Sequence, residues 1–360
     1  MTNAVDDELI ASNNNALRLQ FLNYLRTDFD IEDMGIAHWY LQGRLLQNED
    51  HSIILDQSRY MALIAARFLP QYDNTNITKE EKEKYSSPLP TTFVATKKDC
   101  SKDLVDVQTL EDEFGFQYSS AIGMLIFLLN TATALHFAIR KLERFNTLPG
   151  KNHYKALIRL LHHIRTHKLD YGLKFYPPES NPPIYDLIRR NEPEFDFEAF
   201  PVIIFCDSSW QDCPDTSRST GAYYVYLNGS LVASATFVPV PVAQSSAEAE
   251  YNACAFALTE SIYTKQVWNF LNNKHLDSPI TFAMFTDSES AIAMIDCDHV
   301  TKNSRHIDRR IHFVKQARIQ GMFQVFKIPG EINPSDAGTK NLPGAEIKKH
   351  LPMIHVHVPV

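Results

Sequence analysis

The spacing of apolar and polar positions divides the chain into two regions. In the first region, the stretches 118–145 and 152–166 have the apolar spacing of helices. Pro149 and Gly150 separate them, and this breaker pair favours a helix–turn–helix hairpin. The preceding stretch, 69–113, is largely polar and shows no clear periodicity, so it predicts a long loop or an extended surface segment.

The second region predicts strands mixed with helices. Asn228-Gly229 between two alternating runs is a strong hairpin signal. The expected strands are 200–206, 222–227, 231–237, 280–285 and 323–328, and the expected helices are 245–271, 304–320 and one within 333–351. This pattern predicts an α/β domain.

Composition suggests where these regions begin and end. Residues 1–20 are polar and rich in asparagine, so we expect a disordered start. Five prolines with acidic residues between them fall in or beside 177–199, which predicts an interdomain linker. The expected domains are therefore 21–176 and 200–360, in keeping with 360 residues at ~150 residues per domain.

Overall composition narrows the class of protein. Hydrophobic residues make up 44% and charged residues 22%, a balance typical of soluble globular proteins. The longest apolar run, Ala121–Leu129, is far shorter than the ~20 residues of a membrane span, and the amino-terminal sequence has no secretory signal. The five cysteines are scattered without a Cys-x-x-Cys pair, which excludes a disulfide scaffold or a thiolate zinc site. We expect an intracellular protein without membrane partners.

Two buried-type strands each end in an aspartate, Asp207 and Asp287. If the strands are neighbours and parallel, both carboxylates lie at the same edge of the sheet, where α/β folds place their active sites. Two carboxylates that close repel each other unless a cation lies between them, and such oxygen ligands suit Mg²⁺ or Mn²⁺. The alternative, two aspartates that only form turns, is about as common.

Two further acidic residues are candidates. Ser245 and Glu248 form a capping box at the start of the long helix, and Glu250 shares a helix face with small residues suited to close packing. A carboxylate on that face needs either a metal shared with the aspartates or a salt bridge to an arginine or lysine. Asp336 lies in an Asn-Pro-Ser-Asp helix-start sequence and, by itself, predicts only a helix cap.

Basic residues gather in two segments although the net charge is −8. Residues 138–175 hold nine basic residues against two acidic ones, and residues 301–327 hold seven against one. A charge run is usually a solvated helix face, but two of them in an acidic protein favour a surface for phosphate backbones.

Six segments in order resemble the RNase H domain of copia-type LTR retrotransposon polyproteins. They are CDSSW (206–210), DTSRSTG (215–221), SSAEAEY (245–251), DSESAI (287–292), HIDRRIHF (306–313) and DAGTK (336–340). Ser208 and Ser209 depart from the family's usual residues, and one residue before Gly221 is missing. The linker also looks longer than the family's connection.

The first region is similar to the segment that follows the polymerase palm in the same polyproteins. The matching segments are DMGIAHWYLQGRLL (33–46), YSSAIGMLIFLL (118–129) and HYKALIRLLHHIRTHKLDYGLKFY (153–176). The polymerase signature Tyr-Val-Asp-Asp is absent. On this resemblance the chain cannot polymerise by itself, and the missing polymerase part is an expected partner.

The resemblance implies an RNase H-like mixed sheet with flanking helices, preceded by a mostly helical α+β connection region. Asp207, Glu250, Asp287 and Asp336 would hold two Mg²⁺ ions, with Mn²⁺ as a substitute, and cut the RNA strand of RNA–DNA hybrids. Residues 138–175 would extend the nucleic-acid track of the domain. The expected phosphate contacts are Arg305, Arg309 and Arg310.

Two other interpretations stay open at this stage. The chain could be an inactive or domesticated fragment that binds nucleic acid and cuts nothing, or a structural α/β scaffold, although the scaffold explains neither Glu250 nor the ordered motifs. The implied location is the cytoplasm or a virus-like particle, with the nucleus as a further option.

Overall fold

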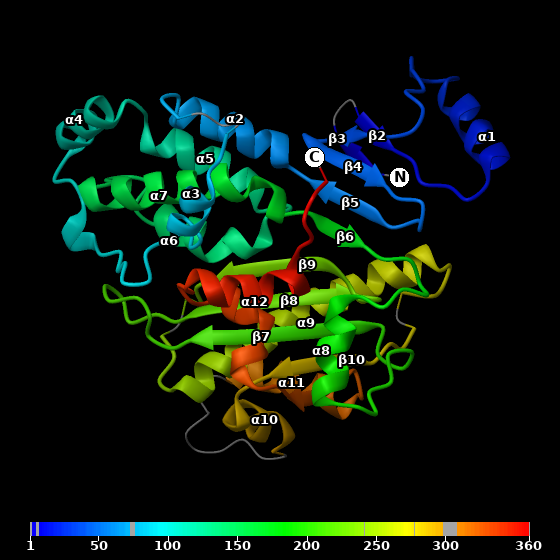
Figure 1. The fold of residues 1–360 in the computed structure, drawn as a ribbon. Helices are drawn as coiled ribbons and strands as arrows, with labels where there is room; N and C mark the ends of the chain where they lie inside the picture. The colour runs from blue at the N-terminus through cyan, green and yellow to red at the C-terminus, as the bar shows by residue number, and fades with distance from the viewer. Residues whose placement is uncertain are drawn as a thin grey trace.

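A five-stranded mixed sheet organises the second half of the chain (Figure 1). In the computed structural model, which describes residues 2–4, 7–72, 76–240, 242–276, 278–297 and 308–359, the strand order is β11-β10-β7-β8-β9. β7, β8 and β9 are antiparallel neighbours, whereas β10 runs parallel to β7 and β11 parallel to β10. The strands are β7 (Val202–Ser209), β8 (Thr220–Leu227), β9 (Ser230–Phe237), β10 (Phe282–Thr286) and β11 (Phe323–Lys327).

Helices cover both faces of this sheet because the residues of β7 are apolar on both sides. Ile204 and Cys206 pack with α9 (Ser246–Leu271), α10 (Glu289–Asp296) and α11 (Asp308–Ile319). Ile203 and Phe205 pack on the other face with α8 (Pro183–Asn191) and α12 (Gly344–Ile354). The expected fold class, an RNase H-like mixed sheet with flanking helices, is confirmed.

The predicted linker contains a helix that belongs to this core. α8 buries Ile184, Leu187 and Ile188 against the sheet, and Pro183 occupies its first turn, where a missing N–H costs nothing. The segment 177–199 is therefore not an extended linker over its whole length. Its prolines start a helix as well as marking a boundary.

The first half combines a small sheet with a group of helices. Its antiparallel strands lie in the order β3-β4-β5-β6. They are β3 (Trp39–Tyr40), β4 (Gly43–Gln47), β5 (Ile53–Asp56) and β6 (Leu173–Phe175). The helices are α2 (Ser58–Phe68), α3 (Lys79–Lys84), α4 (Leu104–Phe114), α5 (Tyr118–Leu128), α6 (His136–Glu143) and α7 (Lys151–His167), with short 3₁₀ turns at η1 (Lys97–Asp99), η2 (Thr133–Leu135) and η3 (Lys168–Asp170).

Three expectations for the first half need correction. The predicted helical stretch 118–145 is broken between α5 and α6 by η2. The predicted loop 69–113 contains α3 and α4, whose starts are capped by Thr78 and Asp103. The expected disordered start holds β1 (Thr2–Ala4) and β2 (Asp7–Leu9), and α1 (Asn15–Leu25) begins inside it with Asn14 as its cap.

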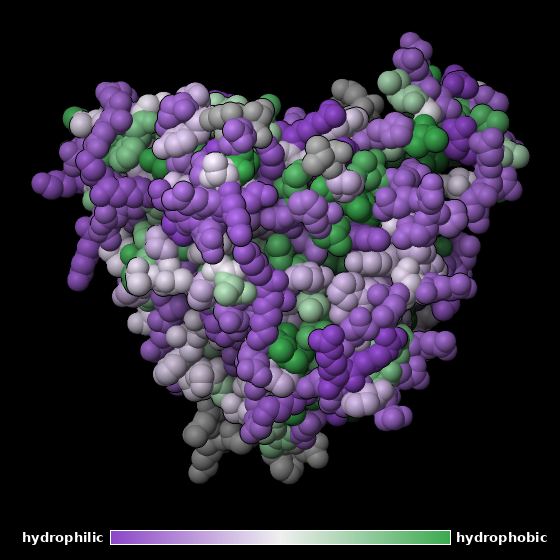
Figure 2. All heavy atoms as spheres, in the orientation of Figure 1, coloured by the Kyte–Doolittle hydropathy of each residue, from purple (hydrophilic) through white to green (hydrophobic). Residues whose placement is uncertain are grey.

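The two halves meet along β6, α6 and α12 (Figure 1). The Tyr176 amide donates to Ser230 Oγ over 2.9 Å, and Gly172 pairs with Val356 in an antiparallel bridge. Hydrophilic side chains cover most of the face shown in Figure 2. Within the described residues, no helix is long and apolar enough to cross a membrane.

Candidate active site

The structure brings three of the four predicted acidic residues together. Asp207 lies on β7, Asp287 directly follows β10, and these strands are parallel neighbours as predicted. Glu250 reaches the same place from the second turn of α9. One carboxylate oxygen from each of the three residues lies within 4.8 Å of the other two. Asp207 is 1% exposed and Glu250 is 9% exposed, so the cluster is largely buried.

The start of α9 fixes the direction in which Glu250 points. Ser245 caps the helix by accepting a hydrogen bond from the Glu248 amide over 3.1 Å. The Glu248 carboxylate accepts from the Gln244 amide over 2.8 Å, so Glu248 holds the chain that enters the helix. Cys254, one turn beyond Glu250, touches Cys206 of β7 with 3.4 Å between the two sulfur atoms. This contact places the helix close against the strand that carries Asp207.

Asp336 lies beside the cluster on η6 (Pro334–Gly338). Lys340 connects it to Asp207, because the ammonium is 2.8 Å from Asp336 Oδ1 and 3.4 Å from Asp207 Oδ2. The Thr339 hydroxyl donates to Asp207 Oδ2. Asn333, which caps η6, donates from Nδ2 to the Cys206 carbonyl over 3.1 Å and so ties this turn to β7. The helix-cap interpretation of Asp336 is therefore wrong, since Asn333 caps the turn and Asp336 faces the cluster.

Burial and mutual repulsion alter the titration of these carboxyl groups. Burial, followed by the nearby Asp207 and Asp287, raises the pKa of Glu250 to about 10. Burial and the nearby Asp207 also raise the pKa of Asp287, and they raise the pKa of Asp336 to about 7. The neighbouring carboxylates raise the pKa of Lys340. Glu250 Oε2 is buried and has no hydrogen-bond partner among the described residues.

The residues present fit a hard divalent cation. Three carboxylates that converge within one coordination sphere are the ligand set that Mg²⁺ and Mn²⁺ prefer. The unpartnered Glu250 Oε2 supplies a ligand atom whose burial has no other compensation in the described part of the chain. The salt bridge that sequence analysis offered as the alternative for Glu250 is not observed among those residues.

The predicted phosphate-binding arginines have different outcomes. Arg305 lies outside the described residues, as does the side chain of Arg309. Arg310 donates to Asn252 Oδ1 over 2.9 Å and stacks over the Phe256 ring at 5.0 Å. Its guanidinium therefore anchors α11 to α9, a use that sequence reasoning missed.

The basic segment 138–175 is also largely engaged within the protein. Five of its nine basic side chains pair with carboxylates, namely Arg140, Lys141, Lys151, Arg165 and Lys174. Arg165 is among the most buried side chains of the described chain. The charge count of a segment does not show how many of its charges face solvent.

Sequence reasoning missed Lys340 as part of the site, although its motif was recognised. Its spacing of four residues from Asp336 was a usable signal, because side chains four apart in a helical turn lie on one face. The closeness of Thr339 to Asp207 had no comparable signal, since 132 residues separate the two.

Comparison with known proteins finds distant relatives of the chain. No family model matches the chain. A Pol polyprotein from transposon TNT 1-94 of Nicotiana tabacum is 24% identical over 98% of the chain, and one from transposon RE1 of Arabidopsis thaliana is 22% identical over 94%. The predicted resemblance to transposon Pol polyproteins is confirmed. The chain spans 24% and 20% of the length of these two retrotransposon relatives.

Two further similarities complete the comparison. An uncharacterized mitochondrial protein of Arabidopsis thaliana is 23% identical over 71% of the chain and 90% of its own length. Among solved structures, an RNase H domain from Mycobacterium tuberculosis covers 41% of the chain and 96% of its own, with a TM-score of 0.29 and 11% identity. The chain is thus similar to transposon Pol polyproteins over most of its length, and its second half contains a five-stranded mixed sheet.

Proposed function

We propose that this chain hydrolyses the RNA strand of RNA–DNA hybrids in a reaction that depends on Mg²⁺ or Mn²⁺. The observation that carries the proposal is the convergence of Asp207, Glu250 and Asp287, with a buried Glu250 oxygen that has no partner in the described structure. Similarity to Pol polyproteins supports a nucleic-acid substrate. The polymerase part of such a polyprotein is the proposed partner.

The chain's own residues would prepare the site in a defined way. Asp207, Glu250 and Asp287, with Asp336 beside them, would hold the cations. When bound, two such ions activate a water molecule and stabilise the leaving oxygen during phosphodiester hydrolysis. Thr339 fixes one oxygen of Asp207, which orients that carboxylate before any cation arrives. Lys340 offsets part of the negative charge and offers an ammonium to an approaching phosphate.

A nucleic-acid-binding module that cuts nothing is the second candidate. It is favoured by Lys340, whose ammonium already lies between Asp207 and Asp336 and supplies part of the positive charge that the carboxylates require. The two candidates differ in whether the remaining carboxylates bind a divalent cation. A metal-binding measurement therefore separates them before cleavage is tested.

The test uses the full chain and a labelled RNA–DNA hybrid in Mg²⁺ or Mn²⁺, with EDTA as the metal-free condition. Cleavage should fall by at least about 100-fold in Asp207→Asn, because a ligand of the transition-state stabilising ions is lost. Asp186→Asn is the matched control, since Asp186 is an exposed residue of α8 that pairs with Arg189. A folded chain that binds the hybrid but leaves it intact in both metals would contradict the proposal and support the second candidate.

A further inference from the structure

The loop that follows Asp207 is held by a helix of the other half of the molecule. Lys141 of α6 contacts Asp212 with 2.6 Å between Nζ and Oδ2, and both side chains are nearly buried. Asp212 Oδ1 also accepts from the Thr220 hydroxyl over 2.7 Å, which joins the loop to the start of β8. Arg144, which directly follows α6, donates to Cys213 Sγ over 2.6 Å.

A third contact from the first half holds the same loop. The Lys97 amide at the start of η1 donates to both oxygens of Asp215, over 3.1 Å and 3.0 Å. The loop 210–219 connects β7, which carries Asp207, to β8, which pairs with it. Its position is therefore set by contacts with the first half as well as by the sheet.

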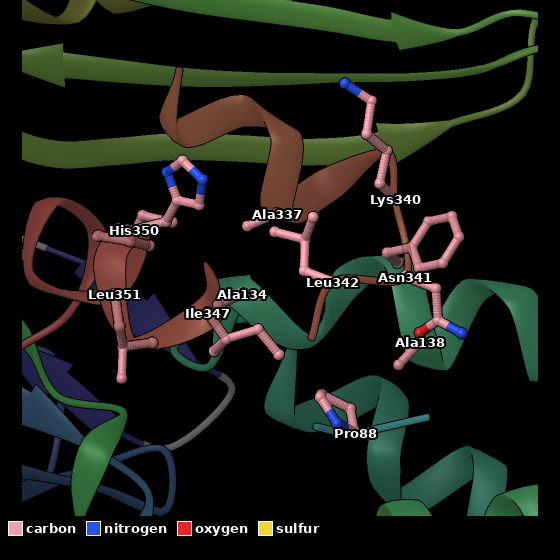
Figure 3. A pocket seen from close by; sticks show the side chains of 12 residues that line it. Pro88, Ala134, Ala138, Ala337, Lys340, Asn341, Leu342, Ile347, His350 and Leu351 are labelled. Carbon is pink, nitrogen blue, oxygen red and sulfur yellow. The ribbon is translucent and has the colours of Figure 1, made fainter. Parts of the chain in front are cut away.

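The same helix also packs against the turn that carries Asp336. Phe137 and Ala138 of α6 line a cavity of about 20 Å³ together with Ala337 and Lys340 (Figure 3). This volume holds about one water molecule, and α6 is in contact with η6. The Lys340 ammonium points away from the cavity toward the sheet, where it meets Asp207 and Asp336. α6 thus packs against the turn that precedes Lys340.

We propose that α6 is a positioning element of the carboxylate cluster: it sets the spacing between Asp207 and the Asp336–Lys340 turn, and so the affinity of the site for divalent cations. This inference rests on the proposed function. The helical half would then be part of the catalytic unit. Lys141 is the residue through which the coupling is tested, because its ion pair crosses between the halves and does not touch the cluster itself.

A metal site tolerates only small displacements of its ligands, which is why α6 should affect cation affinity. Ligands must be held within about 0.5 Å of their productive positions, and loss of a group that orients ligands typically weakens metal binding by about 10- to 100-fold. The Lys141–Asp212 pair is shielded from water. Removal of the Lys141 ammonium therefore leaves Asp212 without a cation and loosens the loop next to Asp207.

The experiment measures Mn²⁺ binding to the full chain by calorimetry, without nucleic acid. We expect Lys141→Met to raise the Kd for Mn²⁺ about tenfold, Asp212→Asn to do the same, and Lys141→Arg to restore the value to within about threefold. Cleavage by Lys141→Met should recover at saturating Mn²⁺, which a merely misfolded variant would not do. Lys151→Met, which breaks the exposed Lys151–Glu113 pair, is the matched control and should leave the Kd unchanged.

The outcomes distinguish this inference from the proposed function. Failure of the unchanged chain to bind Mn²⁺ would overturn the proposed function itself. Normal Mn²⁺ binding without cleavage by the unchanged chain would remove the enzyme claim and leave the positioning role measurable through the Kd. An unchanged Kd in folded Lys141→Met would overturn the positioning role. If Lys141→Met does not fold, an unchanged Kd in the near-isosteric Asp212→Asn variant overturns it instead.

Discussion

Two buried groups of ionisable side chains, one in each half of the molecule, differ in whether a residue of opposite charge compensates them. In the helical half, Arg165 is buried and pairs with Glu81, and the His163 ring hydrogen-bonds both the Tyr85 carbonyl and the Tyr171 hydroxyl. In the sheet half, Glu250 is buried beside other carboxylates and one of its oxygens has no partner in the described structure. Loss of one partner from a buried pair is destabilising, whereas a buried carboxyl group without a partner marks a candidate ligand site.

The largest expected difference between the two halves is in how their stability changes at acidic pH. Burial lowers the pKa of His136 to about 4 and of His163 and His355 to about 3. His136 and His163 belong to the helical half, and the His355 ring, just after α12, packs against Thr133 of that half. Because the unfolded chain binds these protons near pH 6.5, stability falls as the pH drops from about 6.5 toward 4, by on the order of 1 kcal/mol per pH unit for each histidine.

The carboxyl groups of the sheet half act in the other direction. Burial and nearby carboxylates raise the pKa of Asp336 to about 7 and of Glu250 to about 10, above their values in an unfolded chain, so protonation as the pH falls favours the folded state. Hydrogen exchange at pH 7 and pH 4.5 should therefore show α7 losing protection before β7 and β10. His357→Gln, at an exposed residue paired with Asp170, should not change this order. If β7 and β10 lose protection before α7, the predicted order of acid unfolding is wrong.

A pair of matched substitutions sharpens the comparison. Glu81→Gln keeps the capping geometry of α3 but removes the charge that faces Arg165, so we expect a loss of about 2 kcal/mol in the free energy of unfolding. Glu250→Gln removes a carboxyl group that has no cationic partner. It should change the free energy of unfolding by less than about 1 kcal/mol in EDTA while abolishing Mn²⁺ binding.

Denaturant unfolding with and without Mn²⁺ measures both effects. Glu113→Gln, in an exposed ion pair with Lys151, serves as the reference and should stay within about 0.5 kcal/mol of the unchanged chain. A loss in Glu250→Gln as large as that in Glu81→Gln, measured in EDTA, would show that Glu250 has a structural partner after all.

These contrasts explain how far sequence reasoning reached. Strand ends and helix faces are local properties of the sequence. Asp207, Asp287 and Glu250 could therefore be predicted as candidates without knowledge of the structure that brings them together. A charge pattern does not reveal its partners: Arg165 and Lys141 of the basic segment 138–175 make internal ion pairs, and a nucleic-acid surface on that segment stays a prediction. The proline content of 177–199 likewise predicted a linker, although Pro183 begins α8.

The smallest expected effect tests how finely the cluster is placed. A Cβ at Gly330 would lie 2.5 Å from Asp287 Oδ2, so Gly330→Ala must displace that carboxylate. The clash involves the end of a side chain that can rotate, and the free energy of unfolding should therefore change by less than about 1 kcal/mol. Cation binding should still weaken about tenfold, because one ligand has moved.

Gly123→Ala provides the matched control from the helical half. Gly123 lies inside α5 with no atom within 4 Å of an added Cβ, so alanine should stabilise the helix by about 0.5–1 kcal/mol and leave Mn²⁺ binding unchanged. Calorimetry with Mn²⁺ on both variants compares the effect of one methyl group beside Asp287 with its effect in a helix that takes no part in the site. If Gly330→Ala binds Mn²⁺ as the unchanged chain does, the position of Asp287 is not critical, and the cation would depend chiefly on Asp207 and Glu250.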